Sequence, residues 1–224
     1  MGMSYSLPVL TGADRATLVR RTYGLVFVGV LTTIAGAAFG MTQPALMDAV
    51  MAHPFIAFFA MMAPLLMVRS APRVFPRNVL LTLIFTFIEG IWIAPLIFLY
   101  GRAYPGVVSQ AALLTLATFG ALSLFAMFSR RDFSAWGSFF MVGLWVVIAT
   151  SLISMFFPST LGSLWIAGGT LLVFSGLLVF DTWRLVRSGQ FGPDDYVIAA
   201  VQIYLDLLNM FIAILSLLGG GRRR

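Results

Sequence analysis

The chain has 224 residues, of which 60% are hydrophobic and 10% are charged. Soluble domains carry about 25% charged residues, so this composition excludes a water-soluble fold, which could not cover so much apolar surface. The sequence has no cysteine and no lysine, and His53 is its single histidine. These absences exclude a disulfide framework, a thiolate nucleophile, a Schiff-base lysine and a histidine cluster for zinc.

Seven apolar segments follow one another, and each is about as long as the ~20 residues that a helix needs to cross a bilayer. Short breaks such as Tyr104-Pro105-Gly106 and Gly192-Pro193 separate them. The expected spans are residues 23–40, 50–68, 79–100, 107–128, 135–157, 161–183 and 196–218. The sequence therefore predicts an all-α membrane protein. A seven-helix transmembrane domain, 23–218, follows a cytoplasmic N-terminal segment, 1–22, and precedes a Gly/Arg tail, 219–224.

Arginines are divided unevenly between the loops, which favours membrane orientation over nucleic-acid binding as the reason for the net charge of +6. Counted by alternate loops, ten lie on one side, whereas Arg102 and the C-terminal three lie on the other. Since arginine is retained on the cytoplasmic side, the N-terminus is expected there. Seven full spans put the C-terminus outside. A re-entrant last segment would place Arg222–Arg224 inside and change the count to 13 and 1.

Three acidic residues, Glu89, Asp181 and Asp206, lie within the predicted spans. A carboxylate in hydrocarbon is costly unless it is paired, protonated or hydrated, so each is a candidate functional residue. The structural alternative is a carboxyl group that holds helices together by hydrogen bonds. With a rise of about 1.5 Å per residue, Asp206 and Glu89 are expected near the bilayer midplane, and Asp181 nearer the cytoplasmic side.

Asp181 and Asp206 are expected to lean toward each other, because side chains tilt toward the N-terminus of their helix and these two helices are antiparallel. Two like charges in a low dielectric cannot both ionise cheaply, so the pair would share a proton and act as a pH switch. Arg184, one turn after Asp181, is a possible competing charge partner. Arg69, at the inner end of the second span, is another possible partner for a buried acid. Asp194 and Asp195, after Pro193, are expected to cap the last helix and to favour its positive end.

The last predicted helix carries a stripe of polar and small residues. They recur at alternating steps of three and four and so share a face: Ala199, Gln202, Asp206, Asn209, Ala213 and Ser216. Such a stripe is typical either of a pore or cavity lining or of close helix packing with hydrogen bonds. On the first interpretation, Gln202, Asn209 and Glu89 line an ion path, and the last helix faces the interior of the bundle.

The sequence around these acids resembles the transmembrane Bax inhibitor motif family. The similar segments are Phe180-Asp181-Thr182 and residues 85–90, 130–134 and 203–211. The resemblance implies a seven-helix bundle whose last helix is surrounded by the other six. It also implies a pH-sensitive calcium leak with Asp181 and Asp206 as its sensor. Because a lysine-rich tail is absent, the chain is similar to bacterial inner-membrane members rather than eukaryotic ones.

Two classes of function stay open. The first is a passive cation leak gated by protonation of Asp181 and Asp206. Calcium, which takes six to eight oxygen ligands, would bind there transiently, with no tightly bound metal and no cofactor. The second is a non-enzymatic protein that binds or regulates another membrane protein.

Enzymatic functions are weaker alternatives. An intramembrane aspartyl protease also needs two aspartates on neighbouring helices, but the Gly-x-Gly-Asp turn and the Pro-Ala-Leu element of those enzymes are absent. A rhomboid-like serine mechanism lacks a Gly-x-Ser-x-Gly partner for His53. An alternating-access transporter stays possible, although paired broken helices in two matching halves are not evident.

Overall fold

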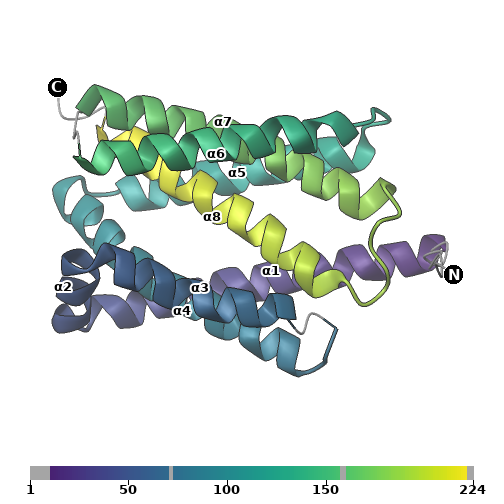
Figure 1. Ribbon diagram of the computed structural model, residues 1–224, viewed down its shortest axis with the longest axis horizontal. Coiled ribbons are helices and arrows are strands. Elements are labelled where there is room, and N and C mark those ends of the chain that lie inside the picture. The colour runs from purple at the N-terminus through teal and green to yellow at the C-terminus, as the bar shows by residue number, and fades with distance from the viewer. Residues whose placement is uncertain (1–10, 71–72, 157–159, 221–224) are drawn as a thin grey trace, which may run out of the picture. The chain divides into compact units, whose positions relative to one another are not determined.

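The computed structural model describes residues 11–70, 73–156 and 160–220, and every regular element in these ranges is an α-helix (Figure 1). In chain order the helices are α1 Gly12–Met41, α2 Pro44–Ala52, α3 Pro54–Ser70, α4 Arg77–Ala103, α5 Val107–Phe128, α6 Ser134–Phe156, α7 Thr160–Arg187 and α8 Tyr196–Gly220.

Six of these described helices, α1 and α4 to α8, are long and apolar enough to cross a membrane. The chain is thus an all-α integral membrane protein. The expected span 50–68 is the exception, because it is divided between the 9-residue α2 and the 17-residue α3. Pro54 begins α3 directly after His53. Since proline has no N–H to donate, it is tolerated in the first turn of a helix and ends the helix before it.

α1 begins at Gly12, well before the expected start of the first span at residue 23. A capping box explains this start. The Thr11 hydroxyl accepts a hydrogen bond from the Asp14 backbone N–H at 3.2 Å, and the Asp14 carboxylate accepts one from the Thr11 N–H at 3.2 Å. Such reciprocal bonds satisfy the first backbone donors of a helix. Apolar content predicts only the part of α1 that can lie in lipid. It therefore does not predict the charged first turns of this helix.

The chain divides into two compact units. The first comprises residues 1–96 and 184–202, and the second comprises 97–183 and 203–224. In the first unit α1 and α4 pack backbone against backbone. Gly36 lies against the Phe87 carbonyl and Gly90 against the Thr33 carbonyl, so closely that neither glycine has room for a Cβ atom. Small residues permit this approach between membrane helices, where Cα–H···O contacts contribute to association.

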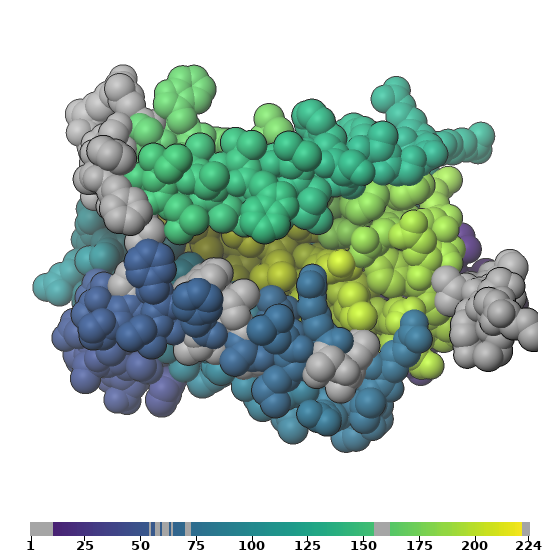
Figure 2. Space-filling view, viewed as in Figure 1, coloured from purple at the N-terminus to yellow at the C-terminus, as the bar shows by residue number. Residues whose placement is uncertain are grey.

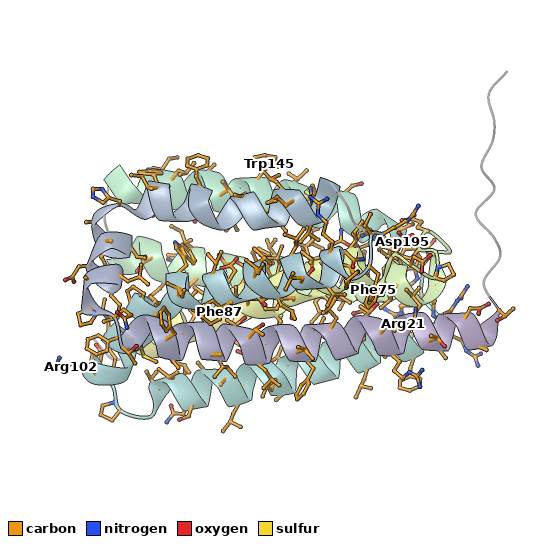
Figure 3. The ribbon with its side chains drawn as sticks, turned by 90° about the horizontal axis from the view of Figure 1, so that it is seen from below. Arg21, Phe75, Phe87, Arg102, Trp145 and Asp195 are labelled. Carbon is orange, nitrogen blue, oxygen red and sulfur yellow. The ribbon has the colours of Figure 1, made fainter. Side chains whose placement is uncertain are left out.

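In the second unit, large side chains of α6 and α7 pack against glycines of the neighbouring helix. Phe180 lies on Gly137, Phe140 on Gly176, and Val173 on Gly143. The opposite face of α6 is open. Figure 2 shows its side chains uncovered along the helix, and Figure 3 shows Trp145 pointing away from it. Trp145 is 66% exposed, which suits a helix that faces lipid, a solvent as apolar as its side chains.

α8 is the most thoroughly buried of the six long helices. In its most apolar window 67% of residues are buried, against 44% or less in each of the other five. None of its residues, all of which are described, is exposed. The helix that carries Asp206 therefore presents no exposed side chain.

Candidate functional site

Two acidic residues are buried in the middle of spanning helices. Asp206 on α8 is 3% exposed and Glu89 on α4 is 2% exposed. Asp206 lies ten residues after the start of α8, and Glu89 twelve after the start of α4. These intervals correspond to depths of about 15 Å and about 18 Å along the helix. Both carboxyl groups therefore lie at mid-helix, and their level relative to the bilayer midplane stays a prediction.

Asp181 and Asp206 belong to the same compact unit, on α7 and α8 respectively. Asp181 is half-buried and precedes Thr182, whose exposure is 0%. Asn209, one turn beyond Asp206, donates a hydrogen bond from Nδ2 to the Leu205 carbonyl at 2.8 Å. The amide of Asn209 is thus partly engaged by its own helix. A shared proton between the two aspartates stays a prediction.

Arg184 and Gln202, both predicted site residues, bond to each other. Arg184 donates from Nη2 to Gln202 Oε1 at 2.5 Å, and its guanidinium lies over the Phe191 ring at 4.9 Å from the centroid. This contact joins the end of α7 to the first turns of α8 within the first unit. Gln202 therefore holds an arginine, in addition to any role along an ion path. Arg69 is exposed, and it has no ion-pair partner among the residues that the structure describes.

Asp195 forms an ion pair with an arginine that lies far from it in the sequence. Arg73 donates from Nε to Asp195 Oδ1 at 2.8 Å and from Nη2 to Oδ2 at 2.9 Å, and the Gly192 backbone N–H donates to Oδ2 at 2.8 Å. Asp195 directly precedes α8, and its carbonyl accepts a hydrogen bond from the Ala199 N–H at 3.1 Å, whereas its carboxylate oxygens bond to Arg73 and Gly192 rather than to the first N–H groups of the helix. The two partners are 122 residues apart in sequence, so no local pattern could reveal the pair.

Asp195 and Arg73 each shift the pKa of the other. Burial alone would raise the pKa of Asp195, but the hydrogen bonds from Arg73 and Gly192, together with the guanidinium charge, lower it below its ordinary value. In turn, the hydrogen bond to Asp195 and its negative charge raise the pKa of Arg73. Asp195 is consequently a fixed anion, stabilised by charge-assisted bonds.

Further arginines hold the segment that links α7 to α8. Arg15 of α1 donates from Nη1 to the Val186 carbonyl at 2.8 Å, and Arg21 lies over the Tyr196 ring at 5.8 Å. Figure 3 shows Arg21, Phe75 and Asp195 near the N-terminal end of α1. Residues 184–202 are thus fastened to α1 and to the α3–α4 loop, and this arrangement fixes where α8 begins.

Glu89 contrasts with Asp195. Its Oε2 atom is buried and has no hydrogen-bond partner, and the carboxyl group forms no ion pair with a described residue. One turn earlier, the hydroxyl groups of Thr86 and Thr32 share a hydrogen bond of 2.5 Å between α4 and α1. In the described part of the chain, no three His, Cys, Asp or Glu side chains cluster as a metal site would require.

Comparison with known proteins places the chain in a family. The sequence model described as "Inhibitor of apoptosis-promoting Bax1" matches residues 15–223. The chain is 31% identical to Bax inhibitor 1 of Schizosaccharomyces pombe, covering 92% of this chain and 77% of that protein. The chain belongs to the Bax inhibitor family.

Relatives within the Bax inhibitor family come from bacteria, plants and viruses. An uncharacterized protein of Helicobacter pylori is 30% identical over 94% of this chain and 90% of its own length. The Golgi anti-apoptotic protein of vaccinia virus is 28% identical over 91% of this chain and 85% of its own length. The family match spans α4, α7 and α8 entirely, so every predicted site residue lies within the part of the chain that defines the family.

Proposed function

We propose that this Bax inhibitor family protein is a passive, pH-sensitive cation leak, in which protonation of Asp181 and Asp206 controls the flow of ions. Calcium is the ion that we propose. The observation that carries the proposal is Asp206, a carboxyl group that is 3% exposed at mid-depth in a spanning helix. An ionisable group at this depth is costly, so its presence favours a role on an ion or proton pathway.

The proposal includes a seven-helix bundle with α8 at its centre. The burial of α8 supports that position, and α2 and α3 together would supply the seventh crossing. The proposed location is a bacterial inner membrane with the N-terminus in the cytoplasm, because arginines are concentrated on that side.

Control by protons follows from the chemistry of two neighbouring carboxyl groups. With one proton between them, Asp181 and Asp206 can share a hydrogen bond that draws α7 and α8 together. With both ionised, they repel each other in a low dielectric. Two arrangements of the same helices then differ in proton content, and pH shifts their populations. Carboxylate and amide oxygens, including those of Asn209 and Gln202, suit weak and transient calcium binding.

The test is calcium entry into proteoliposomes, measured with a trapped dye from about pH 5 to about pH 8. We expect flux that changes with pH in the parent and that loses its pH dependence in Asp181→Asn and in Asp206→Asn. Asp132→Asn is the matched control, because Asp132 is an exposed loop acid that accepts a hydrogen bond from the Ser134 N–H. A folded parent that passes no calcium at any pH would overturn the leak and favour a role in binding another membrane protein.

A further inference from the structure

A buried row of polar side chains runs along α4 from its first turn to its centre. Asn78, Thr82, Thr86 and Glu89 follow at steps of four, four and three, so they share one face of the helix. Each is between 1% and 3% exposed. The row thus leads from the end of α4 that bears Arg77 to a carboxyl group about 18 Å along the helix.

The two hydroxyl groups in this row are oriented by hydrogen bonds. Thr82 donates from Oγ1 to the Asn78 carbonyl at 2.8 Å. Thr86 Oγ1 lies 3.1 Å from the Leu83 carbonyl and shares a hydrogen bond with Thr32 Oγ1. A hydroxyl that donates to a carbonyl retains oxygen lone pairs that can accept a hydrogen bond from a neighbour or from water. The row therefore contains hydrogen-bond acceptors at successive turns below Glu89.

Among the described residues of the first unit, none forms an ion pair with Glu89. α1, which packs on α4 at Gly90, has no charged side chain between Tyr23 and Met41. α3 has none between Phe55 and Val68, and α8 has none from Val197 to Gln202. The other titratable or charged side chains of α1 are Asp14, Arg15, Arg20, Arg21 and Tyr23, all at least ten residues before Thr33, which lies against Gly90. Those of the other described residues of this unit are Asp48, His53, Arg69, Arg73, Arg77, Arg184, Arg187, Asp194, Asp195 and Tyr196. Asp181 and Asp206 belong to the other unit.

An ionised carboxylate in such surroundings would have neither a cation nor a donor to replace water. Its cost would be large, whereas the neutral acid carries a much smaller penalty. We propose that Glu89 is a proton-binding site separate from Asp181 and Asp206, which exchanges its proton along the row formed by Asn78, Thr82 and Thr86. The ligand is a proton delivered by water at the arginine-bearing end of α4. This inference goes beyond the cation leak and does not depend on it.

The chain offers a direct test, because Glu89 is its single glutamate. Glutamate labelled with ¹³C at the carboxyl carbon therefore reports on this one group in the unaltered protein. In lipid bilayers at about pH 7, solid-state NMR should show one carboxyl resonance at the position of a protonated acid. A resonance at the carboxylate position would overturn the proposal. The resonance should stay in place when Asp181 and Asp206 are both changed to Asn, and a shift to the carboxylate position in that variant would disprove separate sites.

The proposed path has its own test. Replacing a hydroxyl in the row should slow hydrogen–deuterium exchange of the Glu89 carboxyl, followed through its infrared C=O band. We expect Thr82→Val to slow this exchange about tenfold or more. Thr115→Val is the control, since Thr115 is equally buried in α5 and its hydroxyl likewise donates to a carbonyl four residues earlier, at 2.7 Å. Equal exchange rates in Thr82→Val and Thr115→Val would overturn the path.

Discussion

Asp195 and Glu89 are both acids of the first unit, and both are nearly inaccessible, at 5% and 2% exposure. Their partners differ completely. Asp195 receives two hydrogen bonds from Arg73 and one from Gly192, whereas Glu89 Oε2 has no hydrogen-bond partner. Asp195 lies in a loop that an arginine from another loop can reach. Glu89 lies at mid-helix, beyond the reach of the arginines at the helix ends.

Burial alone does not decide whether an acid is charged, because hydrogen-bond donors and nearby cations also favour the charged form. The two acids differ in these partners, and an acid at mid-helix is farther from the arginines at the helix ends. A paired acid at a helix end is suited to hold elements together. An unpaired acid at mid-depth is suited to gain and lose a proton.

Gly90→Ala should destabilise the protein most, because the added Cβ would overlap the Thr33 carbonyl on α1. The backbone cannot move aside cheaply, so we expect a loss of about 2–3 kcal/mol in the free energy of unfolding. Thermal unfolding in detergent would measure it. Gly24→Ala is the control, since nothing lies within 4 Å of its Cβ position. If the two variants were equally stable, the packing that keeps donors away from Glu89 would be looser than described.

Arg73→Gln should have the next largest effect. It leaves the Asp195 carboxylate buried without its main partner, and we expect a loss of about 1–3 kcal/mol of stability. Arg77→Gln removes an exposed arginine of the same region that forms no ion pair with a described residue, and its effect should stay within about 0.5 kcal/mol. Similar losses of stability in both variants would mean that the number of positive charges, rather than the Arg73–Asp195 ion pair, stabilises this region.

The contribution of Asp195 should depend on pH in a defined direction. Its pKa in the folded protein is below the ordinary value of 3.8, so the folded state binds fewer protons than the unfolded state as pH falls through this range. The stability lost in Asp195→Asn should therefore be constant at neutral pH and should shrink below about pH 4. Chemical unfolding of parent and variant at several pH values would measure this. A difference that already shrinks near neutral pH would contradict a lowered pKa.

Of the changes at the two acids, Glu89→Gln should have the smaller effect on stability. A protonated acid and an amide are both neutral and similar in shape, so the free energy of unfolding at neutral pH should change by less than about 1 kcal/mol. A stabilisation well beyond that would show that the native carboxyl group is ionised, and the contrast with Asp195 would fail.

The long helices could be predicted from the sequence because lipid imposes a minimum apolar length. α5 spans the expected residues 107–128, and α8 begins at the expected Tyr196. The errors have local causes that apolar content does not report. The capping box at Thr11 lengthens α1 into water, and Pro54 divides one apolar run into α2 and α3.

The candidate site was predicted in part for a similar reason. The positions of Glu89 and Asp206 at mid-helix could be predicted by counting residues from the ends of the apolar segments. The partners of an acid depend on tertiary packing. Arg73 is one of several arginines near the start of α8, and nothing in its neighbourhood distinguishes it as the partner of Asp195. The absence of a partner for Glu89 is equally a property of the packed helices.

The α6–α7 contact restricts how Asp181 can move. Phe180, directly before Asp181, fills the space above Gly137, and Phe140 fills the space above Gly176. If α7 slid along α6 by one turn, about 5.4 Å, Phe140 would meet Phe180 or Val173 in place of a glycine. This packing therefore opposes sliding of α7 along α6. A displacement of Asp181 relative to α6 would therefore require tilting, bending or rotation of α7 rather than sliding along α6.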